Sequence, residues 1–154
     1  MSTLITGGTG FIGAEIARML IDSGEEVHIA HRSGNLGRVE GIAEQVHLHQ
    51  FDLSVPGSAS SLLSEVKPTK LFHFGAILTG PGEEDPQALL QANAAGFIET
   101  IEAARLAGTE QMIFASSIGT YGRDTGGGVI NDLTLQRPSS VYGVTKVLGE
   151  NLGA

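Results

Sequence analysis

Cysteine and tryptophan are missing from this sequence, and aromatic residues make up only 5% of it. Without thiols the chain forms no disulfide bridge and offers no thiolate ligand to a metal. Long hydrophobic runs are missing as well, because no apolar stretch reaches the ~18 residues that a membrane-spanning helix needs. The first residues enter an apolar segment directly, without the basic stretch and cleavage site of a secretory signal. We therefore expect a cytoplasmic protein with no membrane partner.

Positive charge is scarce, since nine Lys and Arg residues stand against seventeen Asp and Glu residues, for a formal net charge of -8. Nucleic acids are bound through concentrated positive potential, so we expect no nucleic-acid partner. With 154 residues, of which 41% are hydrophobic, the chain has the size and composition of one globular domain. That length is short for an enzyme with a separate substrate lobe.

Glycine is abundant at 22 residues, roughly double the ~7% average, and it separates apolar segments that alternate between strand and helix patterns. Apolar runs predict strands at 3–6, 27–30, 46–51, 71–76 and 112–115. Helical spacing predicts helices from 12 to a stop at 24, at 58–66, at 86–106 and from 141 onward, with loops at 32–38 and 122–140. Strands that alternate with helices predict an α/β fold with a doubly wound parallel sheet of the Rossmann type.

Gly7, Gly10 and Gly13 follow the first predicted strand and open the first predicted helix. This is the context of a dinucleotide fingerprint, which needs a tight turn, close backbone approach to the pyrophosphate and close helix packing. The free amides of the helix N-terminus favour an anion without any basic side chain, so an acidic protein can still bind a dinucleotide. The alternative is an ordinary glycine-rich turn, and other motifs must decide between the two.

Tyr142 and Lys146 lie four residues apart on the last predicted helix, where side chains at that spacing share one face. A nearby cation favours the ionised form of a phenol, so such a pair is suited to moving a proton. The same spacing is also common in helices that use Tyr and Lys only for structure. The pair by itself is therefore ambiguous.

Three motifs together resemble the extended short-chain dehydrogenase/reductase family, in family order and over nearly the whole chain. They are Thr-Gly-Gly-Thr-Gly-Phe-Ile-Gly at 6–13, Ala-Ser-Ser-Ile-Gly-Thr-Tyr-Gly at 115–122 and Arg-Pro-Ser-Ser-Val-Tyr-Gly-Val-Thr-Lys at 137–146. The resemblance implies that Tyr142 exchanges a proton with the substrate and that Lys146 assists it and holds the nicotinamide ribose. It also implies that Ser117 donates a hydrogen bond to the substrate oxygen, although a serine pair that merely ends a strand is the alternative.

The resemblance further implies a set of cofactor contacts. Asp52 matches the family aspartate that contacts the adenine, although it could instead cap the end of a strand. Asn93 resembles the asparagine that supports the active site from the long helix, although it could instead bond only to its neighbours. The full predicted cofactor-binding set is Gly7, Gly10, Phe11, Ile12, Gly13, His31, Arg32, Ser33, Asp52, Leu53, Gly75, Ala76, Asn93, Tyr142 and Lys146.

The end of the second predicted strand indicates which dinucleotide is bound. Members of the family that use NAD place an acidic residue there, which takes the ribose hydroxyls and repels a 2'-phosphate. Here that place holds His31, followed by Arg32 and Ser33. A guanidinium offers a planar pair of donors to a phosphate, so we expect NADP to be favoured over NAD. The alternative is that Arg32 is only a solvated loop residue.

In the resembling family a substrate-binding half follows the helix that carries Tyr and Lys. We therefore expect residues 1–154 to be the NAD(P)-binding domain of an oxidoreductase, ending after that helix, with the C-terminal substrate lobe absent from the chain. The expected reaction is hydride transfer at a carbinol or carbonyl carbon of a nucleotide sugar or another alcohol or ketone. We expect the isolated chain to be weakly active or inactive and to form a homo-oligomer. A non-catalytic dinucleotide-binding or sensing module is the alternative.

Three histidines fall on two neighbouring predicted strands, namely His28, His47 and His49. Imidazoles bind transition metals, but the sequence shows no carboxylate with ligand spacing beside them. Packed or exposed histidines are common in strands, so no metal site is expected.

Overall fold

The computed structural model describes residues 1–126 and 128–153. Gly127, in the predicted loop 122–140, and Ala154, the last residue of the predicted domain, lie outside the described residues. Five strands form a parallel sheet in the order β3-β2-β1-β4-β5. Their bounds are β1 Ser2–Thr6, β2 Glu26–His31, β3 His47–Gln50, β4 Lys70–His73 and β5 Gln111–Phe114. The predicted α/β class with a parallel sheet is confirmed.

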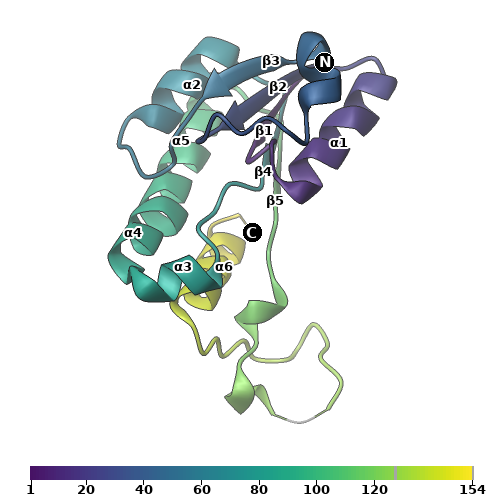
Figure 1. Cartoon of the computed structure of the whole chain (residues 1–154). Helices are drawn as coiled ribbons and strands as arrows, with labels where there is room; N and C mark the ends of the chain where they lie inside the picture. The colour runs from purple at the N-terminus through teal and green to yellow at the C-terminus, as the bar shows by residue number, and fades with distance from the viewer. Residues whose placement is uncertain (127, 154) are drawn as a thin grey trace.

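Helices cover both faces of the sheet, with α1 on one side and α2 and α5 on the other (Figure 1). The bounds are α1 Phe11–Asp22, α2 Ser58–Val66, α3 Thr79–Glu84, α4 Pro86–Leu90, α5 Phe97–Ala107 and α6 Val141–Leu152. Shorter turns are η1 Glu40–Gln45, the π-helical η2 Gln91–Gly96, η3 Ile118–Thr120 and η4 Arg123–Thr125. Among the described helices, none combines the length and the apolar character that crossing a membrane requires.

The alternation of side chains along the strands divides the core into two layers. Leu4 and Ala30 pack against apolar residues of α2 and α5. Ile5 and Ile29, one residue away on the same strands, pack instead with residues of α1. All four side chains are fully buried. Strands that are apolar on both faces are what a parallel sheet between two helix layers requires, and this explains the continuous apolar runs.

The structure differs from the sequence-based prediction between β4 and β5. The fourth strand ends at His73 and not at residue 76, because the Gly75 amide donates to Thr6 Oγ1 (3.2 Å) and leaves the strand ladder. The predicted helix 86–106 is helical throughout but passes through the π-helical η2. At its end a β-carbon on Gly96 would collide with the carbonyl oxygen of Leu53, so only glycine allows this approach.

The pairing of β2 with β3 corrects one premise of the sequence analysis. His28 lies opposite His47 in the parallel register. Glu26 is two residues before His28 on the same strand, and its carboxylate lies close to both imidazoles. The expectation that no carboxylate accompanies these histidines was therefore wrong, because a spacing of two places side chains on one face of a strand.

Candidate active site

The glycine turn at the end of β1 is built by backbone contacts that exclude side chains. Gly7 adopts a left-handed conformation with φ +68, and a β-carbon there would lie 2.8 Å from the Gly75 amide nitrogen. A β-carbon on Gly13 would lie 2.5 Å from the Gly7 carbonyl oxygen. The Gly7 amide donates to the Ala30 carbonyl (3.0 Å), which joins the turn to the end of β2. Glycine is thus required at the first and last positions of the predicted fingerprint.

The N-terminus of α1 follows this turn with its backbone donors available. Gly10 is the N-cap residue and provides no side-chain acceptor for the first helical amides. The first turn of α1 also contains no acidic residue. Free amides and the positive end of the helix dipole favour an anion at this point. The local structure therefore fits the pyrophosphate of a dinucleotide.

A cavity of about 340 Å³ opens at the carboxyl ends of β1, β2 and β4, beside the glycine turn. Eight predicted cofactor residues line it together, namely Gly7, Gly10, His31, Arg32, Ser33, Leu53, Gly75 and Ala76. The lining outside the predicted set is Thr9, Ala30, Phe51, Phe74, Ile77, Leu78 and Ala92. Ala30 and Phe51 carried a usable signal, since the carboxyl ends of parallel strands meet at one edge. Ala92, on η2, carried none.

Other predicted cofactor residues do not line this cavity. Phe11 and Ile12 expose their side chains and line a different cavity along α1, so their contact with the cofactor stays a prediction. Gly13 and Asp52 also lie outside the lining.

Asp52 is held as a turn-capping residue. Its Oδ1 accepts hydrogen bonds from the Ser54 hydroxyl (2.7 Å) and the Ser54 amide (2.9 Å). The bond from the hydroxyl is the main reason that the pKa of Asp52 lies below its ordinary value. The capping role that the sequence left open is therefore present, and contact with the adenine stays a prediction.

Asn93 on η2 supports the loop that follows β4. Its Oδ1 accepts from the Ile77 amide and its Nδ2 donates to the Ile77 carbonyl, both at 2.8 Å. The side chain is only 7% exposed. Because both ends of its amide bind backbone, Asn93 positions the cavity wall around Gly75 and Ala76, and a direct cofactor contact stays a prediction.

Lys146 projects from α6 toward the carboxyl end of β5. It is 5% exposed, and its Nζ donates to the Ala115 carbonyl at 2.8 Å. Nζ also lies 4.6 Å from the ring centroid of Phe114 and 5.5 Å from that of Tyr142. Burial lowers the pKa of Lys146 to about 8. Within the described residues no carboxylate forms an ion pair with it, so its charge remains available to the Tyr142 phenol and to a ligand.

His73 is a buried neighbour of Lys146 that the sequence analysis did not single out. Its Nδ1 shares a hydrogen bond of 3.1 Å with Thr6 Oγ1, the same oxygen that accepts from Gly75. Complete burial, and secondarily the charge of Lys146, lowers the pKa of His73 to about 3. A neutral imidazole thus connects the start of the glycine turn to the lysine.

The two serines after β5 point to different partners. Ser116 Oγ donates to Glu150 of α6. Ser117 Oγ accepts from the Gly119 amide (3.1 Å) and caps η3. A β-carbon on Gly119 would lie 3.4 Å from Ser117 Oγ and 3.7 Å from the Tyr142 ring, so Ser117 Oγ and the Tyr142 ring both border Gly119. The role of Ser117 as a donor to the substrate stays a prediction.

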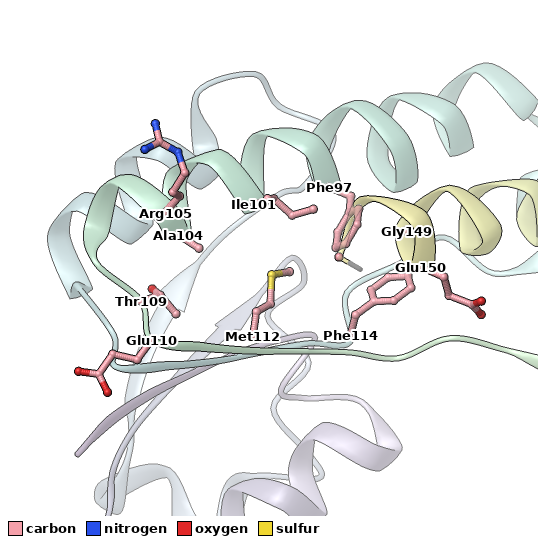
Figure 2. A pocket seen from close by; sticks show the side chains of 11 residues that line it. Phe97, Ile101, Ala104, Arg105, Thr109, Glu110, Met112, Phe114, Gly149 and Glu150 are labelled. Carbon is pink, nitrogen blue, oxygen red and sulfur yellow. The ribbon is translucent and has the colours of Figure 1, made fainter.

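A second cavity, of about 470 Å³, lies between α5 and β5 with the end of α6 at its rim (Figure 2). Phe97 and Phe114 face each other across one end, and Arg105 and Glu110 lie at the other. None of the predicted site residues lines it. This second cavity therefore adds nothing to the predicted site.

Comparison with known proteins agrees with this arrangement. The model of the NAD dependent epimerase/dehydratase family matches residues 3–153. The chain is 32% identical to a UDP-glucose 4-epimerase of Mycolicibacterium smegmatis, over 97% of this chain and 49% of that protein. It is 30% identical to a D-erythronate dehydrogenase of Cupriavidus necator, over 99% and 49%. The UDP-glucose 4-epimerase of Thermus thermophilus, solved in complex with NAD, superposes with a TM-score of 0.86 at 30% identity, over 99% of this chain and 49% of that one. The chain thus spans about half the length of these relatives.

Proposed function

The chain belongs to the NAD dependent epimerase/dehydratase family, and from this premise we propose that it binds an NAD(P) dinucleotide and supports hydride transfer at a carbinol or carbonyl carbon. The observation that carries the proposal is the buried Lys146, which lies beside Tyr142 without an ion-pair partner among the described residues. Burying an ammonium group without an ion-pair partner costs folding free energy. A catalytic role beside the Tyr142 phenol explains why a lysine occupies this position.

Dinucleotide binding is proposed along the carboxyl edge of the sheet. When bound, a nicotinamide dinucleotide supplies the hydride acceptor or donor of the reaction. The glycine turn lets the backbone approach the phosphates, and the first amides of α1 donate to them. Asn93 keeps the opposite wall in place through Ile77.

Proton transfer is proposed for Tyr142. Its hydroxyl exchanges a proton with the substrate oxygen, and the Lys146 charge favours the phenolate that this exchange requires. The Ser117 hydroxyl accepts from Gly119 and keeps its own hydrogen free, so it can donate to the same substrate oxygen. Ser117, from the segment between β5 and η3, and Tyr142, from α6, thereby act on one atom of the substrate, and Lys146 acts through Tyr142.

We propose NADP as the favoured dinucleotide, although the Thermus thermophilus relative was solved with NAD. Arg32 and Ser33 line the cavity at the end of β2, while no acidic residue is among its described lining. His31 Nδ1 is 2.7 Å from the Ser33 carbonyl oxygen and steadies this short loop. A guanidinium at this place favours a 2'-phosphate.

The cofactor preference is tested by fluorescence titration of the purified chain. NADPH should bind more tightly than NADH, and Arg32→Ala should weaken NADPH binding by about tenfold while NADH binding changes little. Arg105→Ala, which removes a guanidinium paired with Glu102 on α5, is the matched control and should bind both dinucleotides like the original chain. Equal affinities for NADPH and NADH, or an equal loss of both in Arg32→Ala, would contradict the preference.

For the substrate we propose a nucleotide sugar or another alcohol or ketone, as the names of the two curated relatives suggest. Turnover of UDP-glucose and D-erythronate is to be measured on the chain and on the same sequence extended by a substrate lobe of the family. Dinucleotide binding without turnover in the extended protein would favour the non-catalytic module instead. Homo-oligomer formation, cytoplasmic residence and the lack of a nucleic-acid partner stay predictions.

A further inference from the structure

A cluster of imidazoles lies at the start of β2 and β3, at the opposite end of these strands from the glycine turn. His28 and His47 are register partners, and Glu26 lies on the same face two residues earlier. His28 stacks on both His47, with ring centroids 4.6 Å apart, and His49, at 5.2 Å. The candidate active site uses none of these four side chains.

Three ligand atoms converge in this cluster. Glu26 Oε1 is 3.6 Å from His28 Nε2 and 3.5 Å from His47 Nε2, and all three lie within 4.8 Å of one another. A tetrahedral Zn²⁺ with bonds of about 2.0–2.1 Å holds its ligand atoms about 3.4 Å apart. The two distances to Glu26 match this spacing to within about 0.2 Å. A zinc ion fits once the exposed His47 ring rotates out of its stack on His28, so that both Nε2 lone pairs point at the ion.

Hydrogen bonding within the cluster leaves the Glu26 carboxylate without a donor. His28 Nδ1 and His49 Nε2 share a hydrogen bond of 3.0 Å. If His28 donates, its Nε2 carries a lone pair that faces Glu26. If His49 donates, the His28 Nε2–H faces Glu26 across 3.6 Å, which is too long for a hydrogen bond. Only the tautomer in which His28 donates from Nδ1 leaves a lone pair on Nε2, and in that tautomer a cation can bridge Nε2 and the carboxylate.

His49 also has the position of an outer partner of a metal-bound histidine. Ligating imidazoles usually donate their second ring N–H to a neighbouring acceptor, which fixes the tautomer and the ring orientation. The His28–His49 bond does this for the most buried ligand, whose side chain is only 12% exposed. The His28 ring is therefore held in place before any ion arrives.

We propose that Glu26, His28 and His47 bind one Zn²⁺, with water as a further ligand and His49 orienting His28. Two imidazoles and a carboxylate form a donor set that zinc uses in proteins. The site lies at the amino ends of the strands, whereas the glycine turn lies at the carboxyl ends of β1 and β2. Its role is to clamp the edge strand β3 to β2, and no part of the active-site chemistry is assigned to it.

The first test is calorimetric titration of Zn²⁺ into the purified, chelator-treated chain. One Zn²⁺ should bind per chain, and Glu26→Gln and His47→Asn should each weaken binding by more than tenfold. Both side chains are more than half exposed, so these variants should keep the fold, which circular dichroism checks. His49→Gln should weaken binding by about tenfold, as loss of an outer partner does.

The matched control is His31→Asn, which removes an imidazole from the same strand. Because side chains alternate along a strand, His31 lies on the opposite face of β2 from Glu26 and His28. This variant should bind Zn²⁺ like the original chain. An absence of stoichiometric binding, unchanged binding in Glu26→Gln, or an equal loss in His31→Asn would each overturn the site.

The second test addresses the clamp. Zn²⁺ should slow amide hydrogen exchange in β3 of the original chain and leave the exchange of the Glu26→Gln variant unchanged. Binding of Zn²⁺ without slower exchange in β3 would overturn the clamping role.

Discussion

The two strand–helix units at the candidate site use different parts of the chain. The unit β1–α1 presents its backbone. A side chain at Gly7 would collide with Gly75, and a side chain at Gly13 would collide with Gly7. The unit β5–α6 presents side chains, with Tyr142 and the buried Lys146 on neighbouring turns of α6 and Ser117 at the N-cap of η3. In the proposed function, phosphate binding therefore depends on close approach of the backbone, whereas proton transfer depends on a buried ammonium beside two half-buried hydroxyl side chains.

Gly13→Val should have the largest effect on dinucleotide binding, because it places a side chain where the glycine turn packs closely against the first turn of α1. Its β-carbon would meet the Gly7 carbonyl oxygen and the Gly8 Cα, which belong to the turn itself and cannot rotate away. We expect loss of measurable NADPH binding and a free energy of unfolding lower by about 1–3 kcal/mol. Titration and chemical denaturation measure the two effects.

Gly41→Ala is the matched control for Gly13→Val, because nothing lies within 4 Å of a β-carbon built at Gly41. It should bind NADPH normally. If Gly13→Val also binds normally, the turn does not depend on close approach and the contrast between the two units fails.

Tyr142→Phe removes one hydroxyl and should distinguish the contributions of the two units, because turnover should fall while dinucleotide binding persists. We expect turnover of the lobe-extended protein to fall by about 100-fold, with NADPH affinity nearly unchanged, since the ring still packs over Gly119 and near Lys146. Steady-state kinetics and a binding titration provide the two readings. Tyr121→Phe, which removes the other tyrosine hydroxyl of the chain, should retain its turnover. Undiminished activity of Tyr142→Phe would assign proton transfer to another group.

His73 links the two units and makes the fold sensitive to acid. Its pKa is about 3 in the folded protein, below the ordinary value of 6.5. Between these values the unfolded chain binds a proton that the folded chain excludes, so stability should fall as the pH drops from about 6.5 toward 3. The loss is at most about 1.4 kcal/mol for each pH unit. Urea unfolding measured at several pH values tests this, with His73→Gln as the comparison. An equally steep pH dependence in His73→Gln would show that other groups cause it.

Much of the site could be predicted because its signals are local. The spacing of Gly7, Gly10 and Gly13 marks a strand–turn–helix unit, and the spacing of Tyr142 and Lys146 puts both on one helix face. The choice of Ser117 over Ser116 stays a prediction, and the structure adds that the Ser116 hydroxyl is bound by Glu150. The alternation of apolar runs with helical patterns was enough to predict the parallel sheet.

The parts that the sequence did not reveal depend on contacts between distant segments. Asn93 binds Ile77 across 16 positions and Lys146 binds Ala115 across 31, and no local pattern encodes either bond. The proximity of Glu26 to His47 follows from the register of β2 and β3, which is known only once the strands are paired. The end of β4 depends likewise on the Thr6 hydroxyl, which takes the Gly75 amide out of the ladder.

The strand order has a consequence for how the chain folds during synthesis. β1 is the earliest strand in the sequence and also the centre of the sheet, with β2 and β3 added on one side and β4 and β5 on the other. Each new strand therefore docks beside one that has already been synthesised. β2, β3 and β5 pair with the strand just before them, whereas β4 pairs with β1, Thr3 lying opposite Lys70. No strand has to be inserted between two others, so only the pairing of β4 with β1 requires closure of a long loop, and one edge of β1 stays open to aggregation until β4 is made.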